Sequence, residues 1–227
     1  VSKVCNIRMV PLAIDIMTGD LTGRPSPVPE LKEQDIPYYG VKESVFPFNM
    51  FPEVDPILGP EMRSTGEVLG ISKSFGEAYY KAQEATKTSL PTEGTVLISV
   101  CDRDKSDLLE VAKAFNEVGF KILATGGTYD MITADGIPAT KVKKLYEGRP
   151  NITDLIANGD ISLIINTPAG KTSAHNDSYI RQEAIKHRIP YMTTMAAAKA
   201  SAEGIKASKN NTNLGVKALQ DFHADIK

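Results

Sequence analysis

Short apolar runs alternate with amphipathic segments over the second half of the chain, and this alternation constrains the fold more than any other feature of the sequence. The runs, such as TVLISVC and ISLIIN, are apolar at most positions instead of at every second one. Strands of this kind are buried on both faces, which is typical of a parallel sheet covered by helices on each side. We predict strands at residues 95–101, 120–124, 139–142, 161–166 and 189–192. We predict helices at residues 105–118, 128–135, 152–158, 177–186 and 194–207. The sequence therefore predicts an α/β fold with a three-layer parallel sheet.

The first 86 residues lack this regular alternation. We predict a helix at residues 1–19, a loop at 22–37, a strand at 38–48, an ordered loop at 51–67 and a helix at 72–85. Pro11 fits only near the start of its helix or at a break between two pieces. Ser72 or Ser74 is the expected N-cap of the last helix. The polar segment TKTSLPTEG that follows predicts a boundary, so we expect one domain at residues 1–86 and a second at 87–227.

Composition excludes several classes of protein. The chain has 227 residues and a formal net charge of −2, which gives no reason to expect nucleic acid as a partner. No apolar run reaches the roughly 20 residues that span a bilayer. Cys5 and Cys101 are far apart and lack the spacing of metal ligands, so the sequence predicts no disulfide framework. We expect a cytoplasmic protein that binds neither nucleic acid nor membrane.

The segment LATGGT, residues 123–128, joins a predicted strand to a predicted helix. Such a turn aims backbone N–H groups and the positive end of a helix dipole at one point, where phosphate is the usual occupant. Thr125 and Thr128 add hydroxyl groups on either side of two glycines, of which Gly127 lies next to the predicted helix. The alternative is a plain strand-to-helix turn in which Thr128 acts only as N-cap.

Polar residues follow the other predicted strands as well. Ser99 ends the first strand and Lys105 opens its helix, Lys144 follows the third strand, and Asn166 and Thr167 end the fourth. Ligands of parallel sheets sit beyond the carboxyl ends of the strands. Each lysine taken singly is better explained as a solvated surface residue, but their shared position favours a phosphorylated ligand such as a nucleotide monophosphate.

The same edge carries no recognisable catalytic group. None of the three histidines follows a predicted strand, since His175 is expected in a loop, His187 at a helix end and His223 near the C-terminus. Asp177 is expected to begin a helix behind Asn176, where an N-cap accounts for the pair. With no nucleophile–base pair and no metal cluster in the sequence, we predict a domain that binds its ligand without catalysis.

Three segments also resemble a known family. The stretch VKESVFPFNMFPEVDPILGPEMRSTGEVLG, residues 41–70, and the motifs EGRP and IINT are similar to the carbamoyl phosphate synthase large subunit family. The first stretch resembles the end of the family's second ATP-grasp half. The chain from Gly94 onward resembles the family's C-terminal allosteric domain, which has the methylglyoxal-synthase-like, Rossmann-like fold. The resemblance implies a partial ATP-grasp α+β segment at residues 1–86 and an effector-binding domain at 87–227.

The resemblance implies an ATP-dependent ligase that makes carbamoyl phosphate from bicarbonate, glutamine-derived ammonia and ATP for pyrimidine and arginine synthesis. The metal-binding carboxylates of its ATP-grasp domain would lie upstream of Val1, so we expect this fragment to be non-catalytic and to hold no cofactor. ATP and Mg²⁺ or Mn²⁺ would serve the complete enzyme. Its expected partners are the remainder of the large subunit, the small glutaminase subunit and a nucleotide effector, with room for self-association through the regulatory domain.

The resemblance also implies two sets of effector contacts. The nucleotide pocket of the family corresponds to Ser99, Lys105, Thr125, Gly127, Thr128, Lys144, Asn166 and Thr167. A second effector of some bacterial members, ornithine, corresponds to Leu58, Tyr191 and Thr193. Two departures from a bacterial pattern, Pro168 in place of threonine and Met192 in place of aspartate, weaken the case for ornithine in particular. The chain has no tryptophan, which argues against N-acetylglutamate. We expect uridine monophosphate as inhibitor, with an inosine-monophosphate-like nucleotide as the other candidate.

Two other readings remain open. Methylglyoxal synthase, an enzyme that eliminates phosphate, shares the fold and a phosphate-binding Thr-Gly turn. That family places a catalytic aspartate after the fourth strand, where this chain has Asn166, and an asparagine cannot act as a general base. A purely structural oligomerisation domain would leave the cluster of hydroxyls and lysines unexplained.

Overall fold

The computed structural model describes residues 1–23, 33–50, 60–86, 89–168, 174–210 and 215–226. Its centre is a five-stranded parallel sheet with the strand order β5-β4-β3-β6-β7. The strands are β3 (Thr95–Ser99), β4 (Lys121–Thr125), β5 (Thr140–Val142), β6 (Leu163–Asn166) and β7 (Tyr191–Met192). The predicted fold class is confirmed.

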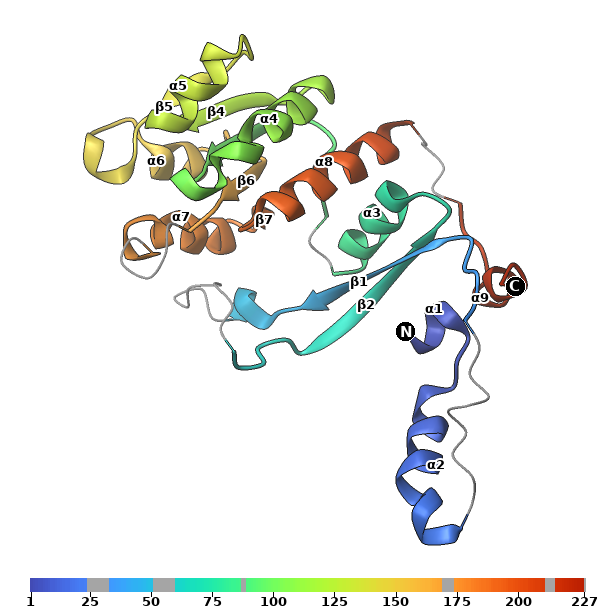
Figure 1. Cartoon of the computed structure of the whole chain (residues 1–227). Helices are drawn as coiled ribbons and strands as arrows, with labels where there is room; N and C mark the ends of the chain where they lie inside the picture. The colour runs from blue at the N-terminus through green and yellow to red at the C-terminus, as the bar shows by residue number, and fades with distance from the viewer. Residues whose placement is uncertain (24–32, 51–59, 87–88, 169–173, 211–214, 227) are drawn as a thin grey trace.

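Helices cover both faces of this sheet (Figure 1). One face packs on α4 (Leu108–Glu117), α5 (Gly126–Ala134) and α8 (Met195–Asn210). The other packs on α6 (Ile152–Ala157) and α7 (Ala174–Lys186). Val96 and Ile98 of β3 point to the first layer and Leu97 to the second, and all three are fully buried. A strand buried on both faces has no polar side to show, which is why its sequence reads as a continuous apolar run.

An antiparallel pair of strands precedes this sheet, with β1 (Tyr39–Val45) paired to β2 (Gly66–Ser72). The sequence prediction missed β2, whose first residues fall at the end of the predicted loop at 51–67. Residues 51–59 of that loop lie outside the described residues. The predicted helix at 72–85 is present as α3 (Phe75–Ala85), which begins three residues later. Two glycines in the seven residues of β2 lower strand propensity. Gly70 is nevertheless required, since a Cβ at this position would overlap the Ala78 carbonyl oxygen of α3 (Phe75–Ala85).

Several predicted boundaries need correction. The first predicted helix is two helices, α1 (Ser2–Cys5) and α2 (Met9–Thr22), and Pro11 lies near the start of the second. Ser74 is the N-cap of α3, where its side chain accepts a hydrogen bond from the Glu77 N–H. α7 begins at Ala174, so His175 is helical and Asp177 does not begin the helix. Single-turn helices η2 (Pro47–Met50), η3 (Asp102–Asp107) and η4 (Leu145–Glu147), and the short α9 (Leu219–His223), were not predicted.

The packing of α3 on α8 joins the first part of the chain to the sheet domain. The Tyr79 hydroxyl lies 3.2 Å from the Ser201 hydroxyl in a buried hydrogen bond. Gly76 of α3 lies so close to α8 that a Cβ there would sit 2.7 Å from the Glu203 carbonyl oxygen. At the far end, Phe222 of α9 meets the Tyr38 ring edge-on, and the Tyr38 hydroxyl donates to the Val4 carbonyl. The division at residue 86 remains a proposal.

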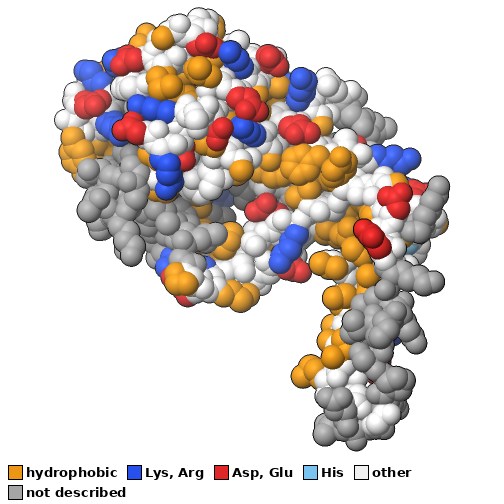
Figure 2. Space-filling model, in the orientation of Figure 1, with side chains coloured by type: hydrophobic (Ala, Val, Ile, Leu, Met, Phe, Trp, Pro, Cys, Tyr) orange, Lys and Arg blue, Asp and Glu red, His pale blue; other side chains and the backbone are white. Residues whose placement is uncertain are grey.

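We expect amide hydrogen exchange to be faster in residues 1–86 than in 94–227, and fastest in α2. This helix extends away from the rest of the molecule and leaves apolar side chains exposed, among them Val10 and Met17 (Figures 1 and 2). Helices without a packed apolar face open readily. Equal protection of α2 and β3 in a dilute monomer, measured by mass spectrometry or NMR, would contradict this expectation.

Candidate functional site

The predicted phosphate turn lies where β4 ends and α5 begins. Thr125 is the N-cap of α5, so the alternative in which Thr128 caps the helix was wrong. The Thr125 side chain makes no hydrogen bond to the first turn, and its hydroxyl instead bonds the Ser99 hydroxyl at 2.9 Å. The first-turn N–H groups, including those of Gly127 and Thr128, therefore receive no acceptor from their cap, an arrangement suited to an anion.

Buried hydroxyl groups connect the carboxyl ends of three neighbouring strands. The Thr128 hydroxyl accepts a hydrogen bond from the Val100 N–H at 3.3 Å, after β3. The Thr167 hydroxyl, after β6, accepts from the Cys101 N–H at 3.0 Å. Because each hydroxyl keeps a hydrogen of its own, Thr128 can still donate one bond. The strand ends are thereby held together as one polar edge.

Lys105 of η3 lies directly over the turn. Its Nζ is 3.2 Å from the point where a Cβ on Gly127 would stand, so the glycine leaves room for the ammonium group. The same Nζ forms an ion pair with Asp102 at 2.6 Å, and Lys105 holds the pKa of that exposed carboxyl below its ordinary value. An exposed ion pair contributes little, so a phosphate can replace the carboxylate at low cost.

Lys144 and Asn166 reach the edge from β5 and β6. Lys144 is half-buried and lies next to η4, where its backbone N–H donates to Glu147 at 2.8 Å. Asn166 is fully buried, with its Nδ2 3.4 Å from the Ser99 carbonyl oxygen and its Oδ1 2.6 Å from the Arg181 guanidinium. Contact with a ligand therefore requires the side chains around Asn166 to move. Sequence reasoning missed Arg181, a fully buried residue of α7.

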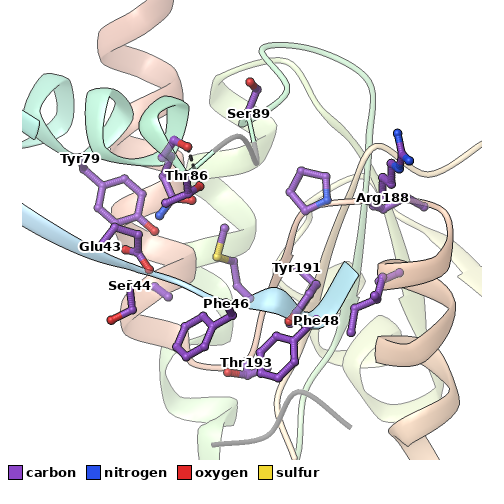
Figure 3. A pocket seen from close by; sticks show the side chains of 17 residues that line it. Glu43, Ser44, Phe46, Phe48, Tyr79, Thr86, Ser89, Arg188, Tyr191 and Thr193 are labelled. Carbon is purple, nitrogen blue, oxygen red and sulfur yellow. Dashed lines mark hydrogen bonds between the residues drawn. The ribbon is translucent and has the colours of Figure 1, made fainter. Parts of the chain in front are cut away.

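The second set of predicted effector residues lines a separate cavity between the β1–β2 pair and the sheet domain (Figure 3). This seam cavity has a volume of about 580 Å³ and includes Tyr191, Thr193 and the departing residue Met192 in its lining. Leu58 lies outside the described residues. Sequence reasoning missed Glu43 of β1, which also lines the cavity, because a glutamate in an exposed-looking strand carries no motif. Burial raises the pKa of the Glu43 carboxyl.

We expect Glu43→Gln to raise the thermal unfolding midpoint at neutral pH. A carboxyl with a raised pKa is held more tightly as the neutral acid in the folded state, so its ionisation disfavours folding as pH rises through that pKa. The advantage of the glutamine should disappear as pH falls below the ordinary range of glutamate. Unfolding midpoints measured between pH 3 and 8 test this, and a gap that widens in acid would contradict it.

The described residues contain no group of three or more His, Cys, Asp or Glu side chains placed to hold a metal ion. Of the helices described, none is long and apolar enough to cross a membrane.

Comparisons with known proteins agree with this architecture. Residues 107–193 match the family model of the MGS-like domain. The carbamoyl phosphate synthase large chain, C-terminal section, of Aquifex aeolicus is 50% identical over 196 residues, 85% of this chain and 36% of that protein. The corresponding section from Methanopyrus kandleri is 50% identical over 184 residues, 81% of this chain and 34% of that protein. The carbamoyl phosphate synthase large chain of Gemmatimonas aurantiaca is 44% identical over 227 residues, 100% of this chain and 20% of that protein.

The chain thus spans between 20% and 36% of the length of these curated relatives. A solved structure entitled "Crystal structure of ForH" has a TM-score of 0.36 and 15% identity over 58% of this chain and 88% of that one, a likeness too weak to support an argument. Identity of 44–50% over 81–100% of this chain, together with the match of residues 107–193 to the MGS-like domain, shows that the chain belongs to the carbamoyl phosphate synthase large-chain family, as the counterpart of its C-terminal section.

Proposed function

We propose that this chain is the regulatory C-terminal part of a carbamoyl phosphate synthase and that its polar sheet edge binds a nucleotide effector. The observation that carries the proposal is the Lys105 ammonium group over Gly127, at the start of a helix whose cap leaves the first N–H groups without an acceptor. A cation, backbone donors and a helix dipole converge there, and phosphate satisfies all three.

In the proposed complex the phosphate accepts hydrogen bonds from the N–H groups of Gly127 and Thr128. The hydroxyls of Thr125 and Thr128 add donors, and Lys105 and Lys144 close over the phosphate from neighbouring loops. Asn166 would reach the sugar or base, while Ser99 and Thr167 support the strand ends from below. Uridine monophosphate is the proposed inhibitor, and an inosine-monophosphate-like nucleotide is the other candidate.

We expect Thr128→Ala to weaken uridine monophosphate binding by about tenfold to hundredfold, because a hydrogen bond to a charged group contributes roughly 1.5–3 kcal/mol. Thr133→Ala is the matched control, since the Thr133 hydroxyl donates to the Tyr129 carbonyl within the same helix. Isothermal titration calorimetry decides between the outcomes. Equal affinity of both variants would place the site elsewhere.

We expect Lys144→Ala to weaken binding as well, by an amount that shrinks in high salt. Half-buried Lys144 would act mainly through its charge, and salt screens charges near the surface. Titrations at low and high ionic strength measure the difference between wild type and variant. A loss that does not depend on salt would contradict this role.

The remaining parts of the function rest on the relatives. The complete protein would make carbamoyl phosphate from bicarbonate, glutamine-derived ammonia and ATP in the cytoplasm, for pyrimidine and arginine synthesis. ATP and Mg²⁺ or Mn²⁺ would be held by the rest of the large chain, with a small glutaminase subunit as partner. We propose that residues 1–227 alone turn over no ATP, which a bicarbonate-dependent ATPase assay of the fragment would test.

The seam cavity supports a second, amine-containing effector. Glu43 offers a carboxylate in a site that also holds Tyr191 and Thr193, and Arg188 lines the same cavity. Ornithine is the candidate that the family resemblance gives. Met192 removes the carboxylate expected next to Tyr191, so we propose weaker ornithine binding than in members with aspartate there. Methylglyoxal synthase chemistry remains disfavoured, because Asn166 occupies the place of the required base.

A further inference from the structure

α7 sends two side chains to the polar edge, although the helix itself lies on the opposite layer from the phosphate turn. Arg181 reaches Asn166 at the end of β6, and Tyr179 reaches the backbone beside Lys144 after β5. Neither residue belongs to the predicted contact set. Arg181 contacts Asn166, which does belong to it, and Tyr179 bonds the residue after Lys144, which also belongs to it.

The Arg181 contact determines which way Asn166 faces. A guanidinium group has five donors and no acceptor, so the atom 2.6 Å from Arg181 must be the Asn166 carbonyl oxygen. The Asn166 amide nitrogen then faces the Ser99 carbonyl oxygen at 3.4 Å. Ser99 in turn bonds Thr125, the N-cap of α5. Thr125 bonds the Ser99 side-chain hydroxyl, a different group from the carbonyl that Asn166 meets, so the Arg181 contact orients Asn166 without reaching the phosphate turn.

The Tyr179 contact fixes the loop after β5. Its hydroxyl accepts a hydrogen bond from the Leu145 N–H at 3.1 Å, one residue beyond Lys144. Leu145 begins η4, a single turn with no buried residue, and Lys144 is its N-cap. Lys144 is therefore held from two sides, by Glu147 within the turn and, through Leu145, by a partly buried tyrosine anchored on a longer helix.

We propose that Arg181 and Tyr179 are positioning residues of the nucleotide site, which set the direction of Asn166 and the place of Lys144 without touching the ligand. This inference rests on the proposed function. It predicts different signatures for the two residues. Arg181 acts on the group assigned to the sugar or base, so its loss should weaken binding of the nucleotide and spare inorganic phosphate. Tyr179 helps to place Lys144, the residue proposed to contact the phosphate, so its loss should weaken binding of both the nucleotide and inorganic phosphate.

The test uses conservative variants, which are chosen to preserve the fold. Arg181→Lys keeps the charge but loses the planar fork that fits the amide, and we expect roughly a tenfold loss of uridine monophosphate affinity, as for one hydrogen bond to a charged group. Its phosphate affinity should be unchanged. Tyr179→Phe removes the hydroxyl that accepts from the Leu145 N–H, and we expect both affinities to fall by roughly three- to tenfold. Arg63→Lys, whose arginine pairs with Glu61 before β2, and Tyr80→Phe, on α3, are the matched controls.

An NMR measurement of the protein without ligand completes the experiment. The side-chain amide NMR signals of Asn166 should shift in Arg181→Lys and stay in place in Arg63→Lys. Unchanged nucleotide affinity in Arg181→Lys would overturn the inference. Equal losses of nucleotide and phosphate affinity in Arg181→Lys that follow its unfolding midpoint would also overturn it, because they indicate a structural role alone. Wild-type protein that binds neither uridine monophosphate nor phosphate would instead remove the proposed function, and the inference with it.

Discussion

Replacing Gly70 with alanine is expected to lower the unfolding temperature of the protein by roughly 6–12 °C, because overpacking of a tight core contact costs up to about 3 kcal/mol. The new Cβ would overlap the Ala78 carbonyl oxygen and lie 2.6 Å from the Ala82 backbone nitrogen. Both atoms belong to the backbone of α3, so no side-chain rotation can relieve the contact. α3 would have to move away from β2, and its packing on α8 would loosen with it.

Gly66→Ala is the control for this substitution. Gly66 lies in the same strand, and a Cβ on it would meet no atom within 4 Å. We expect its unfolding temperature to match that of the wild type, since replacing an unconstrained glycine changes stability by only about 0.4–1 kcal/mol and usually upward. Circular dichroism melts of the three proteins provide the comparison. A Gly70→Ala protein as stable as Gly66→Ala would contradict the close approach of β2 and α3.

Lys105→Glu is expected to abolish measurable nucleotide binding. The change removes a cation from the phosphate turn and places a carboxylate there. Two unit charges about 4 Å apart interact by about 4 kcal/mol at an effective dielectric constant of 20, which corresponds to roughly a thousandfold change in affinity. The fold should tolerate the change, because Lys105 pairs only with the exposed Asp102 among the ion pairs of the described residues.

Lys113→Glu is the control, because it changes the net charge of the protein by the same amount as Lys105→Glu. Lys113 lies in α4 and pairs with Asp135, on the side of α5 away from its first turn. If general electrostatic attraction explained binding, both variants would lose affinity equally. We expect calorimetry to detect no nucleotide binding to Lys105→Glu and nearly wild-type nucleotide binding to Lys113→Glu. Retained affinity in Lys105→Glu would remove Lys105 from the site.

The sheet was predictable because its strands lie between two helical layers. Burial on both faces makes residues 96–98 and 163–165 apolar throughout, and this pattern is visible without any structure. β2 was not predictable in the same way, since Gly70 is selected by the distance to α3, which depends on tertiary packing. α9 was missed because its fixed contacts, Tyr38 to Phe222 and His223 to the Lys3 carbonyl, join the two ends of the chain.

The residues of the candidate site also divide into those that the sequence predicts and those that only the fold reveals. Thr125, Thr128 and Lys105 could be grouped from the sequence, because parallel strands bring their carboxyl ends to one edge. Arg181 looks in the sequence like a surface charge of a polar helix, and only the fold reveals that it is fully buried against Asn166. Glu43 is likewise unremarkable until β1 is seen to line the seam cavity. Residues that act through a distant partner leave no local signal.

An NMR titration of the wild-type protein with uridine monophosphate, which follows every backbone amide, tests the proposed phosphate site most directly. We expect the largest shifts at the N–H groups of Gly127 and Thr128, with further changes near Lys105 and Lys144. Amides around Glu43 and Tyr191 in the seam cavity should move little. Shifts concentrated in the seam cavity, or none at the start of α5 at saturating nucleotide, would contradict a phosphate site at the polar edge of the sheet.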